Sequence, residues 1–311
     1  MPRTKGPYTI PPDPTPLTRC FVNRQGEVRA GWRLVFYVIL MVIPARGIGA
    51  LLAYLKLLPT QTGTMTPGVQ MLNEGVIAIV IVGAAVIMAR LERRPFGMYG
   101  LPRSDRAGKQ VMAGAVWGLV LVSAIIGSIA LLHGYDFGQL ALTEPAILEY
   151  GGAWLVGFAL VGLVEEFMFR GYSQFTLASG IGFWPAATLL SAAFGAAHLG
   201  NPGERGIGAL MVFVTAMFFC LTLRRTGSLW FAVGAHATFD WGETFLYSVP
   251  NSGLVATGHL SASSLHGATW LTGGTVGPEG SVFSFAGLGL SIVLFALFYP
   301  RTASVTSERA G

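Results

Sequence analysis

Long apolar stretches, separated by short polar segments, run through most of the chain. A helix that crosses the hydrocarbon core of a bilayer needs about 20 mostly apolar residues. By this length the sequence predicts eight membrane-spanning helices. They cover about residues 33–57, 71–91, 111–133, 148–177, 182–200, 206–223, 227–248 and 282–300. The predicted fold class is an all-α polytopic membrane protein.

The composition agrees with this pattern. Hydrophobic residues make up 52% of the chain and charged residues only 11%, whereas a soluble domain carries about 25% charged residues. The net charge of +5 does not indicate nucleic-acid binding, because Lys and Arg orient the helices of membrane proteins. We therefore expect a lipid bilayer, and no nucleic acid, as the surroundings of this chain.

Basic residues are confined to alternate connecting segments. The 92–110 segment carries several Arg and Lys residues, whereas the 58–70, 134–147 and 249–281 segments carry none. Arg205 is a mild exception. Cytoplasmic loops are enriched in Lys and Arg, so the pattern predicts that both termini lie in the cytoplasm.

The segments predict a simple domain organisation. Residues 1–31 are polar and Pro-rich, without the apolar region of a signal peptide, and we expect a largely disordered cytoplasmic tail. Residues 32–300 form the transmembrane helical domain. Within it, the Gly-, Ser- and Thr-rich stretch 249–281 predicts a flexible extracytoplasmic loop. A cytoplasmic tail, 301–311, follows, and the lack of organelle targeting suggests a prokaryotic plasma membrane.

Three charged residues lie inside the fourth apolar stretch: Glu165, Glu166 and Arg170. A charge at the bilayer centre costs at least about 2.5–3.5 kcal/mol and usually faces the protein interior. On a helix, Glu166 and Arg170 share one face and can pair, while Glu165 points about 100° away. This spacing predicts a tethered glutamate and a free one. A purely structural ion-pair cluster is the alternative.

Two later spans also carry polar pairs at helical spacing. His198 follows Phe194 by four residues, and Asp240 follows His236 by four. Each pair alone could be a structural hydrogen bond between packed helices. A rise of 1.5 Å per residue, however, places Glu165 and His198 about 22 and 27 Å from the turn at 179–182. His236 and Asp240 are then about 14 and 20 Å deep, so all four groups can meet.

Carboxylate and imidazole groups that lie at a similar depth in the membrane can together activate a water molecule. A carboxylate in apolar surroundings can act as a general base, and a histidine can share the proton or stabilise an oxyanion. Two histidines with carboxylates could instead bind zinc and activate its water. The sequence has no GxSxG, GxGD or HExxH motif, so both routes lead to hydrolysis without a serine nucleophile.

The three motifs together, EExxxR, FxxxH and HxxxD, resemble those of the CPBP family of intramembrane proteases. This family, also called ABI, includes the type II CAAX prenyl endopeptidases. The resemblance covers a catalytic core at about 148–248. It implies an intramembrane endopeptidase, glutamate- or metal-dependent, that acts on prenylated CAAX-type peptides, other membrane-associated peptides or membrane proteins.

The resemblance also implies roles for single residues. Glu165 would activate water together with His198, while His236 and Asp240 would stabilise the oxyanion. A metal, if present, would be bound by the same four residues, and zinc is the metal implied. The supporting residues would be Glu166, Arg170 and Phe194.

The chain departs from the family pattern at Asp240, where the eukaryotic enzymes usually have Asn. An ionised aspartate cannot donate a hydrogen bond to an oxyanion. Asp240 is therefore protonated, an orienter of His236 or a metal ligand. Two other functions are considered: a catalytically silent immunity or scaffold protein, and a proton-coupled transporter. Intact motifs speak against the first, and the absence of inverted repeats speaks against the second.

Overall fold

A computed structural model describes residues 16–23, 26–56 and 64–300, which are mostly helical. The main helices are α1 (Pro16–Phe21), α2 (Ala30–Tyr54), α3 (Pro67–Leu91), α4 (Ala107–Leu131), α5 (Glu144–Arg170), α6 (Tyr172–Ile181), α7 (Phe183–His198), α8 (Gly206–Thr226), α9 (Trp230–Trp241), α10 (Thr269–Thr272) and α11 (Val282–Phe298). Three short helical turns are η1 (Phe96–Met98), η2 (Gly242–Leu246) and η3 (Pro278–Gly280). Strands β1 (Tyr135–Asp136) and β2 (Ser264–Leu265) pair antiparallel.

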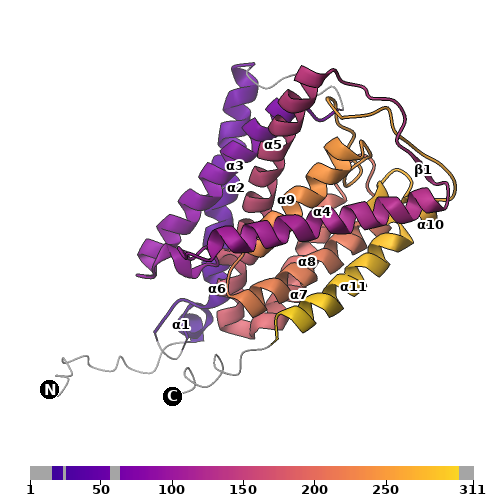
Figure 1. Cartoon of the computed structure of the whole chain (residues 1–311). Coiled ribbons are helices and arrows are strands. Elements are labelled where there is room, and N and C mark those ends of the chain that lie inside the picture. Colours follow the sequence, from indigo (N-terminus) through magenta and orange to yellow (C-terminus); the bar gives the residue numbers. More distant parts are fainter. Residues whose placement is uncertain (1–15, 24–25, 57–63, 301–311) are drawn as a thin grey trace.

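The all-α membrane fold is confirmed. Among the described residues, five helical segments are long and apolar enough to cross a membrane: α2, α3, α4, α5 with α6, and α8. Helix α11 is apolar but has only 17 residues. Figure 1 shows α1 and the C-terminal end of α11 at the same end of the bundle. The count of eight crossings and the cytoplasmic termini stay predictions.

Part of the predicted N-terminal tail is folded. Helix α1 lies within residues 1–31, and Val22 and Val28 form an isolated β-bridge. The indole of Trp32 donates a hydrogen bond to the Cys20 carbonyl at 3.0 Å and stacks on Phe21. The tail is thus tied to α2 from Cys20 onward. The predictions for residues 1–15 and 301–311 lie outside the described residues.

The fourth predicted span, 148–177, is two helices rather than one. The chain breaks at Gly171, where a Cβ atom would lie 2.3 Å from the carbonyl oxygen of Phe167. Because a side chain does not fit there, only glycine allows this bend. The turn between α6 and α7 is at Gly182, whose φ of 87° favours glycine. The path from Glu165 to this turn is therefore bent. The distance estimated from the rise of a single straight helix does not describe it.

Helix α9 packs against α4 through close backbone contacts at two glycines. A Cβ atom at Gly118 of α4 would lie 2.1 Å from the carbonyl oxygen of Ala235 in α9. A Cβ atom at Gly234 would lie equally close, at 2.1 Å, to the carbonyl oxygen of Val111. Small residues of this kind let membrane helices approach each other closely. Figure 1 shows that α4 runs across the bundle and crosses the direction of α3 and α5.

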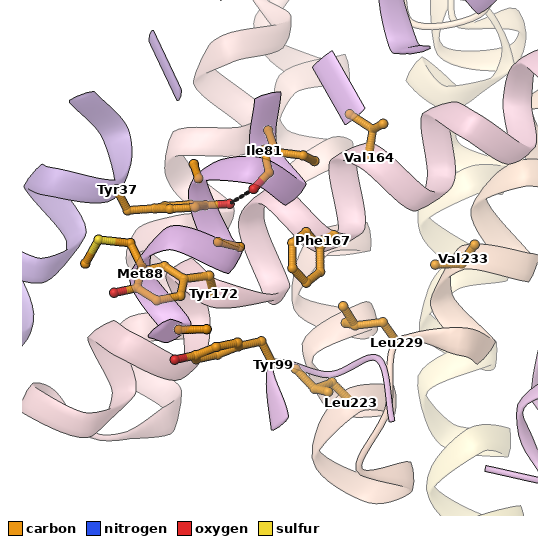
Figure 2. Packing of buried hydrophobic residues seen from close by; sticks show 13 residues of the cluster. Tyr37, Ile81, Met88, Tyr99, Val164, Phe167, Tyr172, Leu223, Leu229 and Val233 are labelled. Carbon is orange, nitrogen blue, oxygen red and sulfur yellow. Dashed lines mark hydrogen bonds between the residues drawn. The ribbon is translucent and has the colours of Figure 1, made fainter. Parts of the chain in front are cut away.

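A buried aromatic cluster joins α2, α3, α5 and α6 (Figure 2). The ring of Tyr172 lies 4.4 Å from that of Tyr37 and 5.0 Å from that of Tyr99, measured between centroids. The Tyr37 hydroxyl donates a hydrogen bond to the carbonyl oxygen of Ile81 at 3.5 Å. The cluster fixes the bend between α5 and α6, and with it the end of α5 that carries the charged motif.

Beside this cluster, Glu92 is the C-cap residue of α3, and its carboxylate accepts four hydrogen bonds. Arg33 donates through Nε at 2.8 Å and also through Nη2, Tyr99 donates at 3.2 Å, and Tyr172 donates as well. Burial alone would raise the pKa of Glu92, but the hydrogen bonds from Arg33 and Tyr172 hold it below its ordinary value. The ionised form of Glu92 therefore stabilises the fold.

We expect the unfolding free energy of this protein to fall in acid because of Glu92. Since its pKa is lower in the folded state, its contribution is present above the ordinary value of 4.5 and is lost as the pH falls through the folded-state pKa. Glu92→Gln should lower the unfolding free energy by about 1–3 kcal/mol near neutral pH and weaken its acid dependence. Thermal unfolding in detergent, from pH 7 downward, measures both; an unchanged acid dependence in the variant would contradict this.

The 249–281 segment is packed, although its composition predicts a flexible loop. The backbone N–H of Ser252 donates to Glu279 at 2.6 Å, and the Trp154 indole donates to the Thr257 carbonyl at 3.1 Å. Asn201, after α7, donates to the Ser252 carbonyl at 2.8 Å. Since these contacts reach α5 and the residues after α7, the segment closes one end of the helical bundle. Its predicted extracytoplasmic side stays a prediction.

Candidate active site

The four residues predicted to meet do line one cavity. Its volume is about 390 Å³, and Glu165, His198, His236 and Asp240 all border it. They come from α5, α7 and α9, and most of the other lining side chains are apolar. The expectation that separate spans bring these groups together is confirmed.

The predicted pair of Glu166 and Arg170 is present. Arg170 Nη1 lies 3.3 Å from Glu166 Oε1, and the exposed fractions of the two side chains are 1% and 0%. The guanidinium lies over the ring of Phe194, 4.4 Å from its centroid, which is a favourable cation–π arrangement. Phe194 thus joins α7 to the buried pair on α5.

His236 links this pair to the cavity. Its Nδ1–H donates to Glu166 Oε1 at 3.0 Å. Its Nε2 lies 3.7 Å from Glu165 Oε2 and 3.5 Å from Asp240 Oδ2. Because one nitrogen is oriented by Glu166, the other is directed at the two carboxylates that border the cavity. The link between His236 and Glu166 was not predicted from the sequence.

Glu165 and Glu166 differ in the way that the helical spacing predicts. The side chain of Glu165 is 23% exposed and that of Glu166 is fully buried. The 3.7 Å between Glu165 Oε2 and His236 Nε2 is longer than a hydrogen bond. The Glu165 carboxylate is therefore available to a water molecule or a substrate in the cavity.

His198 is the last residue of α7, and its tautomer follows from its hydrogen bond. The ring Nδ1 lies 2.9 Å from the carbonyl oxygen of Phe194. Since a carbonyl oxygen only accepts, Nδ1 carries the proton and donates. In the neutral ring Nε2 is then an acceptor. The Phe194 ring packs edge-on against the imidazole at 4.6 Å and fixes its orientation.

The spacing of α5 and α9 sets the distance between the motifs. A Cβ atom at Gly162, one turn before Glu166, would lie 2.9 Å from the Val233 carbonyl oxygen and 3.5 Å from the His236 Cβ. Glycine at this position therefore lets the two helices approach closely enough for the bond between His236 and Glu166.

The arrangement does not fit the zinc site that the sequence leaves open. Among the described residues, no three His, Cys, Asp or Glu side chains are placed to hold a metal ion. The Nδ1–H groups of His198 and His236 donate to Phe194 and Glu166, so only Nε2 of each ring could bind a metal. No step is therefore derived through a metal.

The further polar residues that border the cavity include Glu74 of α3, and Asn251 and Glu279 of the segment after α9. Glu74 could have been found from the sequence, because it is a carboxylate within a predicted span. Asn251 and Glu279 lie in a stretch that reads as a flexible loop, so no sequence signal indicated them.

The comparisons with known proteins agree with the motifs. A family model described as type II CAAX prenyl endopeptidase Rce1-like matches residues 147–242. These residues form an Rce1-like domain. No curated protein and no solved structure matches the chain.

The Rce1-like domain contains every site residue predicted from the sequence, and the suspected family is confirmed. These residues are Glu165, Glu166, Arg170, Phe194, His198, His236 and Asp240. Glu74, Asn251 and Glu279 lie outside the domain. The apolar helices and the Rce1-like match together support a multi-pass membrane protein.

Proposed function

We propose that this protein is an intramembrane endopeptidase in which Glu165 and His198 activate a water molecule. The observation that carries the proposal is the cavity, where the unbonded carboxylate of Glu165 and the imidazole of His198 face a largely apolar space. The Rce1-like domain supports the same reaction class.

In the proposed reaction, Glu165 is the general base. It takes a proton from water while the water oxygen attacks the scissile carbonyl carbon, and the C=O electron pair moves onto the oxygen. Nε2 of His198, which is unprotonated in the neutral ring, accepts the second hydrogen bond of the water. The oxyanion electron pair then re-forms the C=O bond as the C–N bond breaks, and the proton on Glu165 passes to the leaving amine.

His236 is the proposed oxyanion stabiliser. Three carboxylates, those of Glu165, Glu166 and Asp240, lie within 3.7 Å of its ring nitrogens, so they stabilise the doubly protonated ring. Nε2–H can then donate to the developing oxyanion. Of the roles open to Asp240, the geometry favours orientation of His236.

The proposed substrates are membrane-associated peptides. The apolar cavity wall includes Phe158, Phe169, Met211 and Phe219, and it suits the hydrophobic residues of a transmembrane or lipid-modified segment. Prenylated CAAX-type peptides are one such class, and short membrane peptides or membrane proteins are others.

Comparison of membrane peptides tests the function directly. Cells that express the wild type or Glu165→Gln would be compared by mass spectrometry of membrane-bound peptides. We expect new peptide termini only with the wild type, and undiminished cleavage by purified protein in a metal chelator. Identical termini in both samples would contradict the proposed function. Activity lost in chelator and restored by zinc would contradict the metal-free route.

A further inference from the structure

Glu74 is a buried acid of the cavity that the proposed reaction does not use. It lies on α3, before the Rce1-like domain, and only 9% of its surface is exposed. Its Oε1 accepts a hydrogen bond from Gln70 Nε2 at 3.2 Å, while its Oε2 is buried without a hydrogen-bond partner. Both Gln70 and Glu74 border the cavity.

The other cavity acids have roles or partners. Asp240 lies beside His236, and Glu279 accepts hydrogen bonds from the backbone and hydroxyl of Ser252. Glu165 is the proposed base. Glu74 is thus the cavity carboxylate that has no proposed role and keeps one oxygen without a hydrogen-bond partner, and the described residues that line the cavity include no Lys or Arg.

A structural role gives no account of this carboxylate. Its hydrogen bond goes to Gln70, four residues earlier on the same helix, so it does not tie α3 to another element. An unpaired buried charge costs several kcal/mol, and ionisable residues within a membrane usually mark a functional site. An incoming cation would satisfy Oε2 with a charge-assisted hydrogen bond.

We propose that Glu74 binds a Lys or Arg side chain of the peptide substrate, close to the scissile bond. This inference rests on the proposed endopeptidase function. Glu74 borders the same cavity as Glu165 and His236, which places the basic residue within a few positions of the bond that is cut. The apolar stem of Lys or Arg can pack on the cavity wall, for example on Phe158.

A peptide library tests this specificity. Peptides from a digested proteome would be incubated with purified protein in lipid vesicles, and the new termini identified by mass spectrometry. The wild type should cleave peptides with Lys or Arg at one position near the cut about tenfold more often than neutral peptides. Glu74→Gln should lose this preference, measured as the ratio of basic to neutral peptides that the same sample cleaves.

Two controls distinguish binding of a basic side chain by Glu74 from an effect of the substitution on folding. Glu243→Gln changes another buried acid without hydrogen-bond partners, which does not border the cavity, and it should keep the preference. Acetylation of the library removes the lysine charge without changing the protein, and wild-type cleavage at Lys peptides should fall about tenfold while that at Arg peptides persists.

Each remaining outcome decides between the two proposals. Cleavage by the wild type without a basic preference, a preference that survives Glu74→Gln, or a Lys preference that survives acetylation would overturn the role of Glu74 and leave the endopeptidase function standing. Equal absence of cleavage in the wild type and Glu165→Gln would overturn the function, and the role of Glu74 with it.

Discussion

Glutamine in place of Glu165 is expected to lower peptide cleavage by about 10²–10⁴-fold, the usual contribution of a general base. Glutamine has almost the same shape but cannot take a proton from water. Because Glu165 makes no hydrogen bond to His236, the melting temperature should stay close to that of the wild type. Cleavage of a library peptide by purified protein in lipid vesicles measures the effect.

Glu149→Gln is the matched control for this variant, since Glu149 is an exposed carboxylate on the same helix α5. It should leave both cleavage and stability unchanged. Near-normal cleavage by Glu165→Gln, or an equal loss in both variants, would show that Glu165 is not the base.

Arg170→Met is expected to destabilise the protein by about 3–5 kcal/mol, the usual effect of removing one partner of a buried ion pair. The change leaves Glu166 buried with His236 as its remaining partner and also removes the contact with the Phe194 ring. Chemical unfolding in detergent, followed by tryptophan fluorescence, measures this loss.

The double variant Glu166→Gln with Arg170→Met distinguishes pairing from packing. Because it removes both charges, it should be more stable than Arg170→Met alone. The loss of unfolding free energy in the double variant is compared with the sum of the losses in Glu166→Gln and in Arg170→Met. If the losses simply add, the carboxylate and the guanidinium do not depend on each other, and the structural role given to the pair is wrong.

Contacts within one helix were predictable from the sequence. Glu166 and Arg170 lie four residues apart on one apolar helix, so helical spacing alone predicts their pairing and leaves Glu165 on a different face. Glu165, His198 and His236 border one cavity as predicted, because charged groups in a membrane face the protein interior, although the bend at Gly171 makes the depth estimated from a straight helix inexact.

Contacts between helices depend on packing that the residue pattern does not show. The bond between His236 and Glu166 requires the close approach at Gly162, and the bend at Gly171 requires knowledge of the neighbouring carbonyl. Asn251 and Glu279 reach the cavity only because the 249–281 segment folds back over the bundle. A composition rich in Gly, Ser and Thr cannot distinguish such a packed segment from a flexible one.

The central claim is that Glu165 and His198 activate water to cut a peptide bond inside the membrane. The most direct measurement is cleavage of a library peptide by the purified protein in lipid vesicles made up in ¹⁸O-labelled water. The wild type should release a peptide whose new terminal carboxylate carries one ¹⁸O atom, and Glu165→Gln and His198→Ala should release almost none. Products without the label, or equally rapid labelled products from either variant, would contradict the account.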